Sequence, residues 1–190
     1  MISKKELTPI FAPAIFAYIE EYKKIKNGYM ASILIGAITD SIKKWSSSQL
    51  PMMISENALS ILKENLLKHK NKHNFKLESL IWTNRNIFGK VNDKYNNVVY
   101  EHTTPLSIFV QKLIMCKNIN EIENMLINYS GVCILTKSED LQLNKNCYKV
   151  LRPNGWRFCY KKVGINTIPI NDKLESDINS LILDSQCIEV

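Results

Sequence analysis

The sequence predicts a mainly α domain of the α+β class, with helices around a small two-stranded β element. Apolar residues recur at helical spacing through most of the chain, and only two short β-branched runs are typical of strands. The hydrophobic content, 45% of 190 residues, is enough for one compact core. We therefore expect one basic globular domain over residues 1–165, with a helical half (1–90) and a mixed region (97–165), followed by an acidic tail or helix (166–190).

Three helices are expected in the first half. Thr8 with Pro9 predicts the start of the first helix and Gly28 its end, because proline suits a first turn and glycine a helix terminus. The second runs from Tyr29 to Trp45. Ser55 then caps a third helix that continues to about Lys70. The core positions predicted for the second and third helices are Ile33, Ala37, Ile38, Leu59, Leu62 and Leu66.

Two strands, each followed by helices, are expected in the second half. The first strand is Val98 to Tyr100 and the second is Val132 to Leu135. They should pair with each other, since a lone strand leaves its backbone groups without partners. The helices predicted in this half are Thr103 to Cys116, a helix capped by Asn118 or Asn120 that ends at Tyr129, Ser138 to Asn146 capped by Thr136 and Ser138, and Trp156 to Val163.

The charge is unevenly distributed along the chain. Residues 1–165 carry 24 Lys and Arg against 13 Asp and Glu, whereas residues 166–190 carry 1 against 5. A basic body attracts polyanions, of which nucleic acids are the most common in cells. Either the tail folds back over the basic face, or Leu174, Ile178, Leu181 and Ile182 form a terminal core helix. The residues predicted to contact nucleic acid are Lys70, Lys72, Lys145, Arg152, Trp156, Arg157, Lys161 and Lys162.

The segment EHTTP, residues 101–105, carries the sharpest chemical signal. A histidine at a strand end can act as a general base, and the adjacent carboxylate can bind a divalent cation. The second strand then leads into KSEDLQLNKN, where Asp140 and Asn144 share one helical face. Residues 97–146 thereby resemble the HNH, or ββα-metal, nuclease motif. They differ from it in the long segment 103–131 between the strands, where the family has a short loop, and in the absence of flanking CxxC pairs.

This resemblance implies a metal-dependent nuclease that cleaves DNA or RNA, of restriction, phage-defence or toxin type. It makes His102 the general base and Glu101 a ligand of Mg²⁺ or Mn²⁺, with Asp140 or Asn144 as the ligand from the helix. Arg152 or Lys145 would hold the scissile phosphate. The alternatives are a non-catalytic nucleic-acid-binding regulator and a protein-interaction module, in which Glu101 and His102 only cap the helix that follows.

Several other features limit the class of protein. The apolar run from Tyr29 to Ile38 is about half the roughly 20 residues that a membrane span needs, and no secretory signal is expected. Five dispersed cysteines argue against structural zinc and for buried thiols in a reducing compartment. We therefore expect a cytoplasmic protein with nucleic acid as its partner, DNA in preference to RNA, with no membrane contact and with a homodimer as an option.

Overall fold

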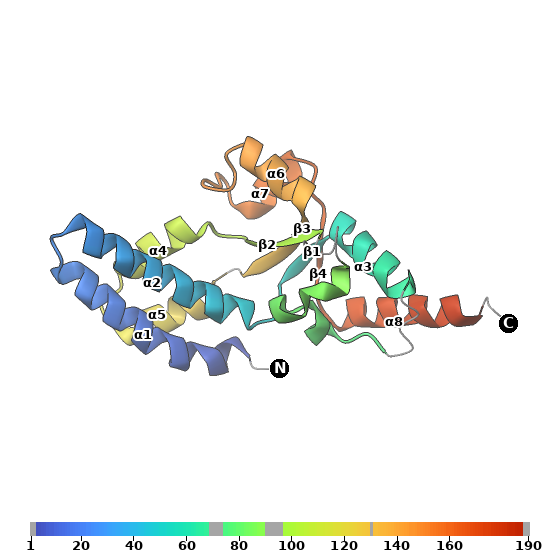
Figure 1. The fold of residues 1–190 in the computed structure, drawn as a ribbon, viewed down its shortest axis with the longest axis horizontal. Helices are drawn as coiled ribbons and strands as arrows, with labels where there is room; N and C mark the ends of the chain where they lie inside the picture. The colour runs from blue at the N-terminus through green and yellow to red at the C-terminus, as the bar shows by residue number, and fades with distance from the viewer. Residues whose placement is uncertain (1–2, 69–73, 90–96, 130, 188–190) are drawn as a thin grey trace. The chain divides into compact units, whose positions relative to one another are not determined.

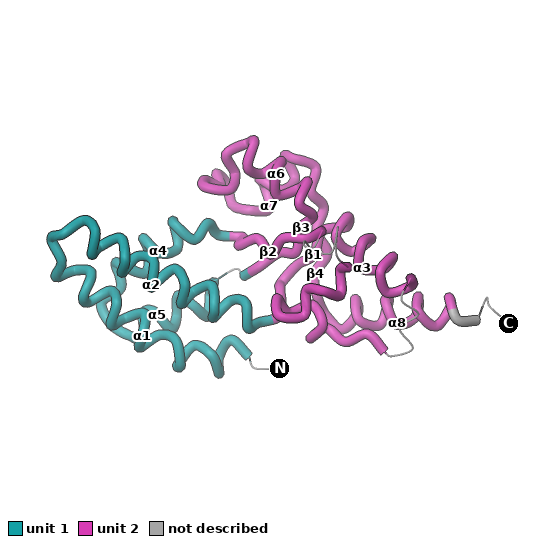
Figure 2. The backbone as a smooth tube through the Cα atoms, viewed as in Figure 1, with its two compact units in different colours: residues 1–49, 104–131 teal, residues 50–103, 132–190 magenta. Residues whose placement is uncertain are grey.

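The computed structural model describes residues 3–68, 74–89, 97–129 and 131–187. The chain is predominantly helical and also contains a four-stranded sheet, so the predicted mainly α class is confirmed for the described part (Figure 1). The chain divides into two compact units (Figure 2). Unit 1 contains residues 1–49 and 104–131, and unit 2 contains residues 50–103 and 132–190. The single basic domain expected over residues 1–165 stays a prediction.

Unit 1 is helical. It consists of α1 (Lys4–Lys24), α2 (Gly28–Ser47), α4 (Leu106–Ile114) and α5 (Ile119–Ile127). Its core centres on three aromatic side chains, with the Tyr129 ring 5.9 Å from the Trp45 ring and 4.5 Å from the Phe109 ring. The Trp45 indole donates a hydrogen bond to Thr8 Oγ1 at 3.3 Å, which satisfies a polar group in this core.

Two helix boundaries in unit 1 differ from the prediction. Ser3 caps α1 in a capping box with Glu6, so Thr8 and Pro9 lie inside the helix. Asn27 caps α2, and Gly28 therefore begins that helix instead of ending α1. The Ser3 and Asn27 side chains accept hydrogen bonds from N–H groups in the first turns of α1 and α2, which proline and glycine have no side-chain acceptor to do. These two residues therefore set the starts of the helices. Ile33, predicted as core, is 46% exposed, whereas Ile38 is fully buried as predicted.

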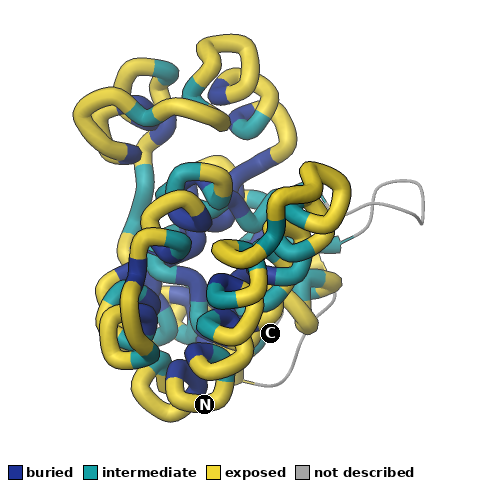
Figure 3. Tube along the Cα trace, turned by 90° about the vertical axis from the view of Figure 1, so that its left-hand side faces the viewer, coloured by how far each residue is buried: buried dark blue, intermediate teal, exposed yellow. Residues whose placement is uncertain are grey.

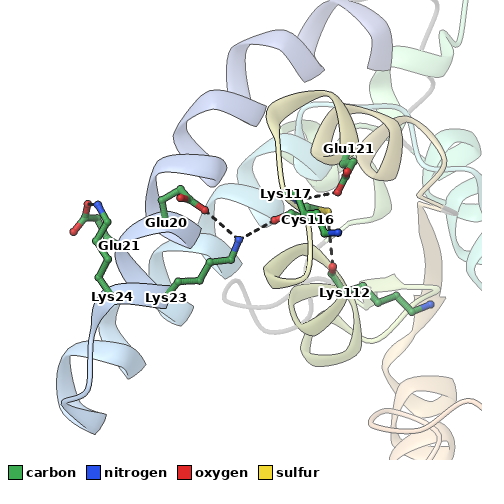
Figure 4. Close-up of polar contacts among 8 residues, drawn as sticks. All are labelled: Glu20, Glu21, Lys23, Lys24, Lys112, Cys116, Lys117 and Glu121. Carbon is green, nitrogen blue, oxygen red and sulfur yellow. Dashed lines mark hydrogen bonds and ion pairs between the residues drawn. The ribbon is translucent and has the colours of Figure 1, made fainter.

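Lysines tie both ends of α1 to the helices that pack on it. Lys23 Nζ donates to the Cys116 carbonyl at 2.9 Å and contacts Glu20 Oε1 at 3.1 Å (Figure 4). At the other end, Lys4 Nζ donates to the Tyr129 carbonyl at 2.7 Å. Both carbonyls follow helix C-termini, where cations are stabilising. Asn118 caps α5, which confirms the first of the two predicted caps, Asn118 and Asn120.

Unit 2 is built on the sheet. Its strands are β1 (Met53–Ser55), β2 (Val98–His102), β3 (Val132–Thr136) and β4 (Thr167–Pro169), in the order β2-β3-β1-β4. The predicted pairing of β2 with β3 is confirmed, and it is antiparallel. β1 pairs in parallel with β3 and antiparallel with β4. The sequence did not reveal β1 or β4, because three residues are too few to display an alternating pattern.

The two sheet faces are covered by different helices. Ile54, Val98 and Ile134 pack in one core cluster with residues of α3 (Glu56–Lys68), η1 (Leu77–Leu80), η2 (Trp82–Phe88) and α8 (Asp172–Cys187). Cys133 and Leu135 pack in another cluster with residues of α6 (Lys137–Lys145) and α7 (Trp156–Lys162). β3, buried along its whole length, separates these clusters. The predicted core positions of α3, namely Leu59, Leu62 and Leu66, are all buried.

The acidic C-terminal segment is a core helix and not a loose tail. Leu174, Ile178 and Ile182 of α8 are buried against α3 and the sheet, which confirms the second of the two predicted alternatives. Glu175 accepts a hydrogen bond from the Leu77 backbone N–H at 2.8 Å, so this acid stabilises η1. Across the described ranges, none of the helices has the length and apolarity of a membrane-crossing segment.

Candidate nucleic-acid interface and buried carboxylate cluster

The predicted pair Glu101 and His102 closes β2, as expected, but the two side chains point to opposite sheet faces. Glu101 lies opposite Cys133 and His102 lies opposite Val132 in the antiparallel register. Because successive residues of a strand alternate between faces, Glu101 faces α6 and α7, whereas His102 faces the side covered by α3 and α8. Through this alternation His102 is directed away from the sheet face that carries Glu101, with which it was predicted to act.

Glu101 forms a buried ion pair with Arg152, which lies in the segment between α6 and α7. The Arg152 side chain is 3% exposed and that of Glu101 is 11% exposed. The guanidinium carbon lies 5.2 Å from the Tyr160 ring centroid. Arg152 Nε and Nη1 and Tyr160 Oη have no hydrogen-bond partner among the described residues. Arg152, predicted to hold a scissile phosphate, is thus already engaged by a carboxylate inside the unit.

A second acid–base pair lies beside the first. Asp140 Oδ2 of α6 accepts from Lys149 Nζ at 2.9 Å, while Asp140 Oδ1 is buried without a hydrogen-bond partner in the described part of the chain. Burial raises the pKa of Glu101, the Arg152 charge opposes this rise, and the Asp140 charge adds to it. We call Glu101, Asp140, Lys149, Arg152 and Tyr160 the carboxylate cluster. Its two carboxylates come from β2 and α6, and their charges influence each other.

The carboxylate cluster has limited capacity for a metal ion. Asn144, the other predicted ligand, is exposed on α6. No group of three or more His, Cys, Asp or Glu side chains that could hold a metal occurs within the described ranges. Mg²⁺, however, often uses one or two carboxylates and completes its coordination with water and substrate phosphate. The orphaned Asp140 Oδ1 fits such a ligand, and Glu101 would first have to loosen its pairing with Arg152.

Glu139 is a buried carboxylate that the sequence reading did not single out. Its Oε2 accepts from Ser55 Oγ at 2.7 Å and from Thr136 backbone N and Oγ1 at 2.7 and 2.9 Å. Its Oε1 accepts from Asn57 Nδ2 at 3.0 Å. Glu139 therefore joins the start of α3 to the start of α6. The spacing of Thr136 and Glu139 is that of a capping box, a signal that could have revealed this role.

The charged side chains exposed between residues 137 and 163 all carry positive charge. This segment contains nine charged residues, and only Glu139 and Asp140 are acidic. Glu139 is 4% exposed and the Asp140 side chain is 14% exposed. In Figure 3 most positions of this uppermost segment are exposed. We define the α6–α7 surface as the exposed side chains of Lys137, Lys145, Lys149, Arg157, Phe158, Lys161 and Lys162.

The structure sorts the other predicted contact residues by exposure. Lys145, Arg157, Lys161 and Lys162 are on the surface as expected, whereas Trp156 is buried with 8% exposure. Lys70 and Lys72 lie outside the described residues. The cysteines behave largely as predicted: Cys116, Cys133 and Cys159 are buried, but Cys147 is exposed in the turn after α6.

Comparisons of the chain with protein-family models, with curated proteins and with solved structures found no match.

Proposed function

We propose that this chain binds nucleic acid through the α6–α7 surface. The proposal is carried by the single sign of the exposed charge there, since Glu139 is buried and Asp140, whose side chain is 14% exposed, pairs with Lys149. A patch of one sign keeps its attraction for phosphates, whereas interspersed acids would cancel it. Binding would be sequence-independent in its electrostatic part and strongly dependent on salt.

Neutralising the cations of α7 should weaken this binding. In Lys161→Gln/Lys162→Gln two phosphate contacts are removed, so the slope of log affinity against log salt should fall by about 2. The measurement is fluorescence anisotropy of labelled DNA and RNA oligonucleotides over a range of KCl concentrations.

A matched control uses Lys44 and Lys112, which are exposed lysines in the last turns of α2 and α4. Lys44→Gln/Lys112→Gln changes the net charge by the same amount and loses the same interaction with a helix C-terminus. If both double variants lower the slope equally, binding follows the total charge of the chain and the α6–α7 surface is not the site.

A second function, metal-dependent hydrolysis of the bound strand, is favoured by the orphaned Asp140 Oδ1 beside Glu101. We propose that Asp140 and Glu101 would hold the Mg²⁺ or Mn²⁺ of such a nuclease, with Lys149 near the substrate phosphate. The cation would stabilise the charge that develops on the phosphate. His102 is not required in this arrangement, because it faces the opposite side of the sheet.

The nuclease proposal predicts that Asp140→Asn removes cleavage of plasmid DNA or of RNA in Mg²⁺ or Mn²⁺ but retains oligonucleotide binding. His102→Ala should cleave at the wild-type rate. Loss of cleavage in His102→Ala would instead support the general base expected from the HNH resemblance. A folded wild-type chain that cleaves neither substrate in either metal leaves only the binding function.

A further inference from the structure

The aromatic side chain that α7 exposes is that of Phe158, and not that of Trp156, which was predicted from the sequence to contact nucleic acid. Trp156 and Tyr160 are 8% and 1% exposed, and their rings pack edge to face with centroids 5.3 Å apart. They belong to the core cluster beneath α7. Phe158 is 38% exposed, although an amphipathic reading of α7 places it in the core with Trp156. A large apolar ring is thus presented on the outside of a basic helix.

Cations surround this ring. Lys161 and Lys162 follow Phe158 at the i+3 and i+4 positions, which lie next to it on a helix surface. The Lys162 ammonium lies 5.7 Å from the Phe158 ring centroid. The remaining exposed side chain of α7, Arg157, stacks over the Trp156 ring at 4.5 Å. A phosphate held by Lys162 would therefore bring its own nucleoside within reach of the Phe158 ring.

We infer that the α6–α7 surface takes single-stranded nucleic acid in preference to duplex, with one base stacked on Phe158. This inference rests on the proposed nucleic-acid binding. A duplex presents phosphates but keeps its bases stacked on each other, so an exposed phenyl ring gains little from it. A single strand offers unstacked bases, and aromatic side chains beside cations are the usual platform for them. The same segment also exposes Val150 and Leu151, by 60% and 61%, which suits a partner with apolar faces.

The test compares one labelled sequence as a single strand and as a duplex, with the full chain and fluorescence anisotropy. The wild-type chain should bind the single strand more tightly. Phe158→Leu keeps an apolar side chain but removes the aromatic face, and it should weaken single-strand binding by about tenfold while leaving duplex binding unchanged. Phe158→Tyr keeps the ring and should bind as the wild type does.

Trp82 of η2 supplies the matched control. It is 39% exposed, and Arg85 stacks on it at 4.4 Å, so it is another aromatic–cation pair on the surface of unit 2 but outside the α6–α7 surface. Trp82→Leu should bind both oligonucleotides as the wild type does. Equal wild-type affinity for strand and duplex, or an unchanged affinity in Phe158→Leu, overturns the single-strand inference and leaves the proposed function intact. Binding to neither oligonucleotide overturns the proposed function itself.

Discussion

Replacing Arg152 with methionine should lower the free energy of unfolding by about 3 kcal/mol, because it leaves the Glu101 carboxylate buried without its partner. Arg152 is 3% exposed and Glu101 11%, so water cannot take over the lost interaction. Methionine keeps much of the length of the arginine side chain, so the loss arises mainly from the charge. Urea denaturation of the full chain, followed by circular dichroism, measures the change.

The loss in Arg152→Met should depend on pH in a defined direction. The pKa of Glu101 is raised in the folded chain, mainly by burial. This carboxyl group therefore favours the fold at low pH, and its contribution is lost as the pH rises through the folded-state pKa. Arg152 lowers this pKa, so its removal raises the pKa further. The deficit of the variant should consequently be larger near pH 8 than near pH 5.

The double variant Glu101→Gln/Arg152→Met is the control for this explanation. It removes both charges, so it should recover a large part of the stability lost in Arg152→Met. Its stability should also vary less with pH. A double variant that is as unstable at every pH as Arg152→Met would show that Arg152 stabilises unit 2 through packing on Tyr160 and not through its charge.

Replacing Glu139 with alanine should also cost about 3 kcal/mol, because the side chain accepts hydrogen bonds from several donors at once. Its hydrogen-bond donors include Ser55, which is fully buried, and Thr136, which is 7% exposed. Alanine would leave these buried hydroxyl groups without their acceptor and would leave a cavity in place of the carboxylate. Glu139→Gln should cost less, since the amide oxygen still accepts from part of this set. The midpoint of urea denaturation reports both changes.

Glu64→Ala is the matched control for Glu139. Glu64 lies on α3 with 69% side-chain exposure and contacts Lys68 at 4.0 Å. Its replacement should change the free energy of unfolding by less than about 0.5 kcal/mol. If Glu139→Ala changes the free energy of unfolding as little as Glu64→Ala does, the starts of α3 and α6 are held together by the backbone and not by the Glu139 carboxylate.

Signals that act over a few residues predicted much of the fold. The Ser55 cap and the helical stripe of α3 are both present, because they depend only on neighbouring backbone groups. The pairing of β2 with β3 was predictable because the backbone N–H and C=O groups of two otherwise isolated strands need hydrogen-bond partners. The partnership of β1 and β4 was not predictable in this way, since it depends on contacts between residues more than 100 positions apart.

The candidate site was less accessible to the sequence. The burial of Arg152 and the exposure of Phe158 have no signal in the sequence, because tertiary contacts decide how α7 and the segment before it pack on the sheet. Strand alternation alone could have separated Glu101 from His102, since adjacent strand residues face opposite ways. The Asp140 charge raises the pKa of Glu101, whereas their expected joint role as metal ligands stays a prediction.

The discontinuity of unit 1 has a consequence for the nascent chain. Its core joins Trp45 from residues 1–49 to Phe109 and Tyr129 from residues 104–131. Translation releases α1 and α2 well before α4 and α5, so this hairpin leaves the ribosome with its apolar face still uncovered. During that interval the apolar residues of α1 and α2 that belong to this core can make non-native contacts. A rearranged chain in which residues 104–131 follow residue 49 directly, with residues 50–103 then joined to residue 132, would shorten this interval.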